Sequence, residues 1–506
     1  MPPIGSGCFG FLKETTAEMG DRKSAANLAT GVAYQAINTV MGLVLPYLFI
    51  TGFGSETNGL LSSVTQLFVY VELLEAGVGA AAMQAMYRPL ANRDRDGVNG
   101  ILAAASRRYL RTGALYLLTV AALALAYPLA VSTSLPRRTV AAVVFLQGCG
   151  GAVNYLVSGK YSVLLRAEGK LYILNSLSLV SSVLRNAGKI AAIAMGYGVV
   201  TVQAVHLAVT LLYSLAIVVY MKWKYRWARP WGRPDFQAIA QSGSALVHQL
   251  AWLVFNHTDI ILLTFAAGDL ALVSVYSLYL LVFEAIQNLL DVVGKSLQYK
   301  MGYHAQASAD ELRRYYRRYE SCFLALSFAL ILITYLLVRG FIGLYTAGVT
   351  DADYLAPGLP ELFAGMKLLS LIRQMERQAV EAAGHFRRTR NFSLVEMGLN
   401  LGISLVLVFS WNIYGVLAGS IAALVYSVTV YTRYTNRVIL ASDCRPSCAW
   451  IAVFLVTFVA LAAVGNALLP VEYESYQQLI LTAVPVSAAV CAVFGGELYL
   501  ASRTRD

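Results

Sequence analysis

Two carboxylates interrupt one of the apolar stretches of the sequence. Residues 68–90 read FVYVELLEAGVGAAAMQAMYRPL and contain Glu72 and Glu75, although the stretch is long enough to cross a bilayer. An ionised carboxylate in hydrocarbon is costly, so such residues normally face protein or trapped water. Their spacing puts Glu72, Glu75 and Gly79 on one helix face. The two acids are predicted either to take part in ion or proton coupling or to pair with Arg or Lys across a helix interface.

Three further acids lie in other apolar segments: Asp259, Glu284 and Asp291. Asp259 shares a helical stripe with several polar residues, and Glu284 and Asp291 share another. The other residues of these stripes are Gln241, Ser244 and His248, with Asn256 beside them, and Ser277, Asn288 and Lys295. Together with Glu72 and Glu75, the three acids are the predicted candidates for H⁺ or Na⁺ coupling.

Two cations lie one helical turn apart in segment 172–195. They are Arg185 and Lys189, and no acid lies in the same segment. Neutral donors share their stripe, namely Asn175, Ser178 and Ser182. Because paired positive charges in a membrane segment must be neutralised by a group from elsewhere, we predict that this stripe faces a substrate. Structural pairing with a neighbouring helix is the alternative.

Segment 359–382 carries another polar stripe. Lys367 lies on it and Arg373 lies on an adjoining one, and both are assigned to the substrate-facing group. The charged residues near the inner end of the segment are also interpreted as a salt-bridge network of their own; these are Arg373, Glu376, Arg377 and Glu381. Polar stripes in several segments of both halves of the chain predict a shared aqueous cavity.

The composition defines the elements that must position these residues. The 506 residues are 58% hydrophobic and only 13% charged, with a mean hydropathy of +0.60. Such values are typical of an all-α polytopic membrane protein. Fourteen spans of about 20 residues are predicted. They lie near 26–50, 60–84, 110–133, 139–158, 172–195, 199–221, 238–265, 270–294, 321–345, 359–382, 392–411, 414–435, 449–469 and 478–500.

The distribution of Arg and Lys supports this count. Basic connections such as 222–233 alternate with neutral or acidic ones such as 52–57 and 470–476. By the positive-inside rule, both termini are predicted to be cytoplasmic. No cleavable signal peptide is expected, because the first apolar stretch runs on to spanning length. The net charge of +11 indicates attraction to anionic lipid headgroups and not to nucleic acid.

An internal repeat organises the spans. GSETNGLLSSVTQLFVYVELLEAGVG (54–79) aligns with GDLALVSVYSLYLLVFEAIQNLLDVVG (268–294), and further matches lie at similar separations of about 210 to 217 positions. Six spans separate the copies, so the two halves are predicted to be related by a pseudo-two-fold axis along the membrane normal. The predicted parts are a cytoplasmic N-terminus (1–23), an N-terminal six-helix bundle (24–222), a cytoplasmic linker (223–237), a C-terminal six-helix bundle (238–440) and helices 13 and 14 (448–501).

Several classes of function are disfavoured by the sequence. It contains no phosphate-binding GxxxxGK[ST] loop and no HExxH motif, so we expect no enzyme and no ATP hydrolysis. The six cysteines are scattered, and only Cys444 and Cys448 are close together. These two lack further ligands nearby, so free thiols are predicted and neither a metal site nor a cofactor is expected.

The pattern GSETNGLLSSVTQLFVYVELLEAGVGAAAMQAMYRPLANRD (54–94) resembles the early region of bacterial polysaccharide transporters. These are O-antigen or Wzx-type lipid-linked oligosaccharide flippases of the MATE-like MOP superfamily. The resemblance implies two bundles that move a polyprenyl-diphosphate-linked glycan from the inner to the outer leaflet by alternating access. It also implies membrane lipids, a polysaccharide polymerase and glycosyltransferases as partners. A cationic cavity suits the diphosphate, because Arg binds phosphate oxygens with two parallel hydrogen bonds.

Two other functions stay open at this stage. A cation-coupled multidrug or organic-ion exporter of the same fold should have an acidic or apolar cavity, and Arg185, Lys189 and Lys367 argue against that. A lipid scramblase or a non-transporting scaffold would use the polar stripes only for packing. Assays of glycan export and drug efflux would discriminate these functions.

Overall fold

The computed structural model describes residues 22–75, 77–239, 253, 257–307, 309–470 and 472–503. All regular structure in these residues is helical, as predicted. Nine of the described helical segments are long and apolar enough to cross a membrane. The broken second span, α8 (Leu171–Ala194) and α13 (Leu359–Ala382), which carry polar stripes, are not among them. The chain is therefore a multi-pass membrane protein.

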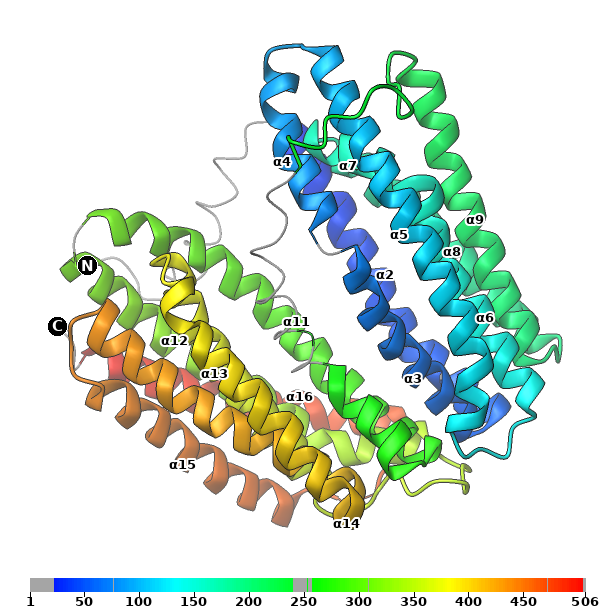
Figure 1. Cartoon of the computed structure of the whole chain (residues 1–506). Helices are drawn as coiled ribbons and strands as arrows, with labels where there is room; N and C mark the ends of the chain where they lie inside the picture. Colours follow the sequence, from blue (N-terminus) through cyan, green and yellow to red (C-terminus); the bar gives the residue numbers. More distant parts are fainter. Residues whose placement is uncertain are drawn as a thin grey trace. The chain divides into compact units, whose positions relative to one another are not determined.

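The chain divides into two compact helical units. Unit 1 comprises residues 1–48, 68–129 and 136–246, and unit 2 comprises 49–67, 130–135 and 247–506. Segments 49–67 and 130–135, which the repeat assigns to the first bundle, therefore pack with the helices of the second. Figure 1 shows the helices coloured along the sequence.

In unit 1, α9 packs against α6 and α8, and α4 packs against α7. Its helices are α2 (Arg22–Phe53), α3 (Ser55–Val71), α4 (Val78–Ala91), α5 (Arg95–Ala130), α6 (Arg137–Val153), α7 (Gly159–Ala167), α8 and α9 (Val199–Lys224). Of these, α2 and α5 end in unit 2, and α3 lies mostly in unit 2. The predicted linker begins on this unit, because Asn99 of α5 bonds the backbone of Trp227 and Arg229.

Unit 2 is built around α12 and α13, which pack against each other. α12 spans Ala309–Tyr345, and the further helices of the unit are α11 (Leu270–Ala307), α14 (Phe386–Tyr434), α15 (Arg445–Leu468) and α16 (Tyr476–Arg503). Phe363 of α13 stacks on Tyr279 and Phe283 of α11. The rings of Phe328, Phe454 and Phe494 join α12 to the two C-terminal helices.

α14 is a helical hairpin that contains the predicted spans 392–411 and 414–435. The chain turns at Asn412, whose φ is +47°. The two legs are in close contact, since a Cβ at Gly415 would lie 2.4 Å from the carbonyl oxygen of Leu407. The hairpin explains how two spans follow one another with almost no connection.

The second predicted span, 60–84, is not one continuous helix. α3 ends at Val71, a 3₁₀ turn follows at Glu72–Leu74, and α4 begins after Gly77, which has a φ of +79°. Glycine suits this left-handed conformation because it has no Cβ. The prediction of an unbroken span was wrong, because apolar periodicity continues through a backbone break. In bundles of membrane helices, such discontinuous segments often surround substrate and ion sites.

Candidate functional site

Glu75 lies at the break between α3 and α4. Its Oε1 atom accepts hydrogen bonds from the backbone N–H of Gly79 and from the hydroxyl of Tyr109, both at 2.9 Å. The Gly79 N–H belongs to the first turn of α4, where backbone donors lack helical partners and a negative charge is favoured. Glu75 therefore caps α4, a structural role. Its predicted part in coupling is not tested by this geometry.

Glu72 lies in the 3₁₀ turn and is exposed within the unit. Across the described part of the chain, no Arg or Lys forms an ion pair with it. The structural alternative, a salt bridge across a helix interface, is thus not observed for Glu72 among these residues.

The neutral residues of the α8 stripe hold helices together. Asn175 donates to the carbonyl oxygen of Asn27 on α2 at 3.3 Å, and Ser182 donates to the side chain of Asn38 on α2 at 2.8 Å. Ser178 bonds the hydroxyl of Tyr213 on α9. These contacts give Asn175 and Ser182 a packing role, and their predicted contact with a substrate stays a prediction.

Arg185 and Lys189 differ from their neutral neighbours on α8. Lys189 is only 8% exposed, and it lies close enough to Arg185 for the two positive charges to repel. In the described residues, neither cation has an ion pair or a hydrogen bond. Arg185 is half-buried and Lys189 is buried, and two adjacent like charges without a counter-charge are unfavourable, so a group from outside the unit is expected to neutralise them.

His206 of α9 lies near this cation pair and was missed by the sequence analysis. The charges of Lys189 and Arg185 both act on its ring, and its buried Nδ1 atom has no hydrogen-bond partner among the described residues. The only sequence signal was its place in YGVVTVQAVHLAV (197–209), which aligns with YGVLAGSIAALVY (414–426) as one of the further matches of the internal repeat.

Lys367 of α13 is buried in unit 2 and has polar neighbours on α11. Its Nζ donates to Oε1 of Gln287 at 2.9 Å and lies 3.9 Å from Oε1 of Glu284. Glu284 is about half exposed, so this longer contact is weak. Lys367 and Glu284, assigned to separate functions from the sequence, are therefore neighbours.

Arg373 forms a buried ion pair with Glu396 of α14. The second oxygen of Glu396 accepts a hydrogen bond from Ser427, which satisfies the carboxylate further. The pair joins α13 to both legs of the hairpin, so the geometry gives Arg373 a structural role. Asp291, the repeat counterpart of Glu75, accepts a hydrogen bond from Gln374 of α13 and lies in an unbroken helix.

Asp259 is 7% exposed, and in the described part of unit 2 no Arg or Lys lies within ion-pair distance of it, although the charge of Lys367 acts on it. Its Oδ2 atom accepts hydrogen bonds from Tyr276 at 2.7 Å and Ser420 at 2.9 Å. Its Oδ1 atom and Oδ1 of Asn400 have no hydrogen-bond partner among these residues. A proton or a bound cation would satisfy these two unmatched acceptor atoms. Several residues of the predicted stripes lie outside the described residues. They are Gln241, Ser244, His248 and Asn256 from the stripe of Asp259, and the side chain of Lys295 from the stripe of Glu284 and Asp291.

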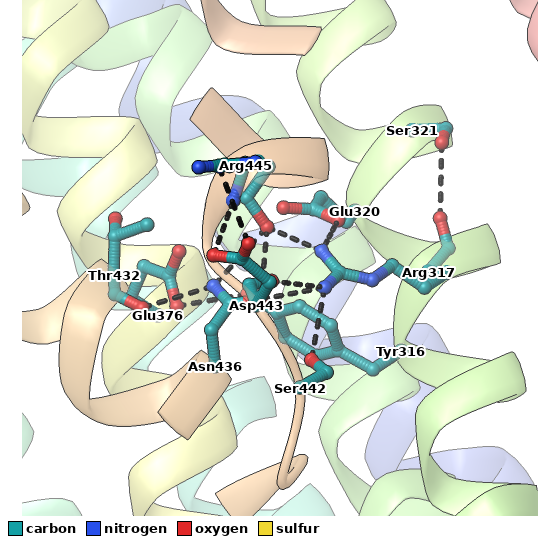
Figure 2. A network of polar contacts seen from close by, with 11 residues as sticks. Tyr316, Arg317, Glu320, Ser321, Glu376, Thr432, Asn436, Ser442, Asp443 and Arg445 are labelled. Atoms are coloured by element: carbon teal, nitrogen blue, oxygen red, sulfur yellow. Dashed lines mark hydrogen bonds and ion pairs between the residues drawn. The ribbon is translucent and has the colours of Figure 1, made fainter. Parts of the chain in front are cut away.

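A polar network surrounds Arg317 of α12 in unit 2 (Figure 2). Its guanidinium bonds Glu320 at 2.9 Å and also reaches Asn436, Ser442 and Ser447. These partners fasten α12 to the connection that leads into α15. Of the predicted salt-bridge network of Arg373, Glu376, Arg377 and Glu381, one pair is present, Arg377 with Glu381 at 3.5 Å. Arg373 pairs with Glu396 instead, and Glu376 has no ion pair among the described residues.

α3 is bound to α11 by side chains within unit 2. Asn58 donates to Ser274 at 2.8 Å, and Ser62 donates to Ser277 at 3.2 Å. The partners are 216 and 215 positions apart, which matches the repeat spacing. Residues at nearly equivalent positions of the two repeats therefore touch within unit 2.

The loop after α12 closes over the start of α3. Asp351 accepts hydrogen bonds from the backbone N–H and the hydroxyl of Ser55, at 2.7 and 2.6 Å. The Tyr354 hydroxyl bonds both Ser55 and Ser274, and burial raises its pKa, so it stays neutral at physiological pH.

The fold is similar to that of solved transporters of the MOP superfamily. A lipid II flippase, MurJ, in an inward closed conformation matches with a TM-score of 0.66 and 11% identity, over 93% of this chain and 99% of that one. An inward-facing multidrug resistance MATE transporter of the MOP superfamily matches with a TM-score of 0.62 and 15% identity, over 80% and 97%.

A MOP-superfamily transporter from Pyrococcus furiosus, described as having a binding pocket of reverse polarity, matches with a TM-score of 0.52 and 14% identity, over 82% and 96%. All three proteins are transporters or flippases and not enzymes. No protein-family model and no curated protein matches the sequence.

Proposed function

We propose that the chain is a flippase that moves a polyprenyl-diphosphate-linked oligosaccharide from the inner to the outer leaflet of a bacterial inner membrane. Surface polysaccharide such as O-antigen is the proposed destination of the glycan. The observation that carries the proposal is the cation pair of the half-buried Arg185 and the buried Lys189, which has no counter-charge among the described residues.

A lipid diphosphate supplies what this pair lacks. Two adjacent cations match a doubly charged headgroup, and Arg binds phosphate oxygens with a planar fork of donors. The unpartnered Nδ1 of His206 would accept a hydrogen bond from a glycan hydroxyl. The polyprenyl tail needs no polar contact and would remain in lipid.

The fold similarity supports this substrate class. The lipid II flippase matches a larger share of this chain than the MATE transporter does, 93% against 80%. A multidrug exporter is the rival function, but a cationic site would repel the cationic compounds that such proteins export.

Coupling to an ion gradient is a second part of the proposal. Asp259 is the proposed carrier of H⁺ or Na⁺, because its Oδ1 atom and Asn400 Oδ1 are buried without partners among the described residues. Both termini are proposed to be cytoplasmic, as the positive-inside rule indicates.

Reconstitution of the purified protein into liposomes tests the substrate class. A fluorescent polyprenyl-diphosphate-linked glycan should cross the bilayer in proteoliposomes and not in empty liposomes, while a fluorescent cationic drug should not accumulate. Drug transport without glycan transport would favour the exporter. Equal movement of ordinary phospholipids would favour a scramblase.

A further inference from the structure

The segment at the end of α9, residues 222–237, exposes aromatic rings and cations side by side. Trp223 is 71% exposed, Trp231 59% and Phe236 38%. The only acid of the segment, Asp235, accepts hydrogen bonds from the two backbone N–H groups that follow it closely. Its Lys and Arg side chains are all exposed and form no ion pair among the described residues; they are Lys222, Lys224, Arg226, Arg229 and Arg233. The segment thus combines apolar surface with positive charge that no acid compensates.

The start of α5 holds the backbone of this segment in place. The Asn99 side chain bonds the carbonyl oxygen of Trp227 at 3.1 Å and the N–H of Arg229 at 2.7 Å. The N–H of Asp235 donates to the carbonyl oxygen of Gly100 at 3.0 Å. Figure 1 shows the coil running from the end of α9 back across unit 1. Contacts with unit 1 therefore set where the side chains of the segment lie.

Cations of α5 and α7 lie against two of the aromatic rings. Arg95 Cζ is 5.6 Å from the ring centre of Trp227, and Lys160 Nζ is 4.6 Å from that of Trp231. Lys160 is only 7% exposed and, within the described chain, forms neither an ion pair nor a hydrogen bond, so the rings of Trp231 and Tyr161 are its partners. A cation–π contact fixes a ring by one face and does not bury it. Trp231 is thus positioned by the chain and still left mostly exposed.

The place of the segment in the fold indicates what covers these rings. α9 is long and apolar enough to cross a membrane, so residues 222–237 begin where the bilayer ends. A soluble anion would neutralise the cations but leave the tryptophan rings in water. An uncharged bilayer surface would cover the rings but leave the cations without counter-charge. An anionic phospholipid satisfies both, because Trp is favoured at the headgroup level and Lys and Arg are attracted to anionic headgroups.

We propose that residues 222–237 form a binding site for anionic phospholipids of the phosphatidylglycerol class. Trp223 and Trp231 lie at the headgroup level, and the exposed Lys and Arg side chains bind the lipid phosphates. Lys160 and Arg95 act as positioning residues for the aromatic rings. The site goes beyond the proposed function, since it needs no transported substrate.

Thermal unfolding of the purified full-length protein in detergent tests the site. Short-chain phosphatidylglycerol should raise the melting temperature of the wild type in a saturable way, and short-chain phosphatidylcholine should not. For Arg229→Gln/Arg233→Gln, the half-saturating phosphatidylglycerol concentration should rise about tenfold, which corresponds to about 1.4 kcal/mol. Arg137→Gln/Arg138→Gln is the matched control, because it removes two exposed cations of the same unit outside the segment and should leave that concentration unchanged.

Tryptophan fluorescence locates the lipid without relying on stability. The emission that Trp231→Phe lacks relative to the wild type is that of Trp231. Phosphatidylglycerol brominated on its acyl chains should quench this emission more strongly than brominated phosphatidylcholine does. Equal quenching by the two lipids would show that the ring meets the bilayer without selecting charge, and the proposal would be wrong.

Three outcomes of the unfolding experiment would also overturn the proposal. The first is a wild type that phosphatidylglycerol does not stabilise. The second is an equal loss of the response in the Arg137→Gln/Arg138→Gln control, which would mean that the lipid reads only the net charge. The third is stabilisation by glycerol 3-phosphate at the same concentrations as phosphatidylglycerol, which would indicate a site for soluble anions.

Discussion

Gly59 of α3 lies directly against the backbone of Leu270 at the start of α11. A Cβ atom at position 59 would be 1.8 Å from the carbonyl oxygen of Leu270, closer than any real contact. Only glycine therefore allows α3 and α11 to approach as they do. This contact, the hydrogen bonds from Asn58 and Ser62 and the cap on Ser55 hold the first half of α3 to unit 2.

Gly59→Ala should separate α3 from α11. We expect a loss of stability of about 1–3 kcal/mol, as for other overpacked positions, despite the better helix propensity of Ala. The melting temperature in detergent measures the effect. Gly398→Ala on α14 is the control, since a Cβ there has no neighbour within 4 Å. If the melting temperature of Gly59→Ala equals that of Gly398→Ala, the tight contact between α3 and α11 is contradicted.

A disulfide between positions 62 and 277 tests whether this contact opens during transport. The two serine Oγ atoms are 3.2 Å apart, so cysteines at these positions should bond under oxidation. If alternating access requires α3 to leave α11, oxidation of Ser62→Cys/Ser277→Cys should stop glycan flipping, and a reductant should restore it. The two single-cysteine variants should be insensitive to oxidant. Full activity of the cross-linked protein would show that the contact persists through the cycle.

Arg373 and Glu396 should behave as a structural pair. Removing one partner leaves a buried charge, so Arg373→Ala should lower the free energy of unfolding by about 3–5 kcal/mol. The double variant Arg373→Met/Glu396→Leu should recover much of this loss, because it buries no charge. Both melting temperature and flipping per folded molecule are to be measured. If the double variant is stable but no longer flips the substrate, Arg373 belongs to the substrate site, as predicted from the sequence.

Ion coupling should depend on Asp259 and not on Glu75. Asp259→Asn should remove the dependence of flipping on an imposed Na⁺ or H⁺ gradient while the protein still folds. Glu75→Gln should lower stability by about 1 kcal/mol, because the cap of α4 loses its charge, and should keep the gradient dependence. The reverse pattern would make Glu75 the coupling residue, with Asp259 serving only Tyr276 and Ser420.

Hydropathy and charge distribution were sufficient to predict the helical fold, because lipid imposes long apolar helices whatever their packing. They also located the turn of the α14 hairpin, within a residue of Asn412. The break at Glu72–Gly77 was not predictable in this way, since Ala and Gly continue an apolar helical pattern and the left-handed φ of Gly77 appears only in three dimensions.

The partners of the charged residues were harder to predict than the residues themselves. Arg373 was recognised as buried and polar, but Glu396 lies 23 positions away on another helix, and no helical spacing connects them. Asn175 and Ser182 form hydrogen bonds with α2 about 145 positions earlier. Sequence patterns show which face of a helix is polar, whereas the neighbouring helix decides whether that polarity is already satisfied.

Flipping activity of the Arg185 and Lys189 variants tests the central claim most directly. Transport of the polyprenyl-diphosphate-linked glycan is to be measured in proteoliposomes and normalised to folded, monodisperse protein. Arg185→Ala and Lys189→Ala should each lose most of the activity, Arg185→Lys should recover only part because it lacks the bidentate fork, and Arg138→Ala, which removes an exposed cation of the same unit, should be unaffected. Full normalised activity in both alanine variants, or rescue of Arg185→Ala by neutralising Glu72, would contradict the assignment and make the cation pair a structural feature.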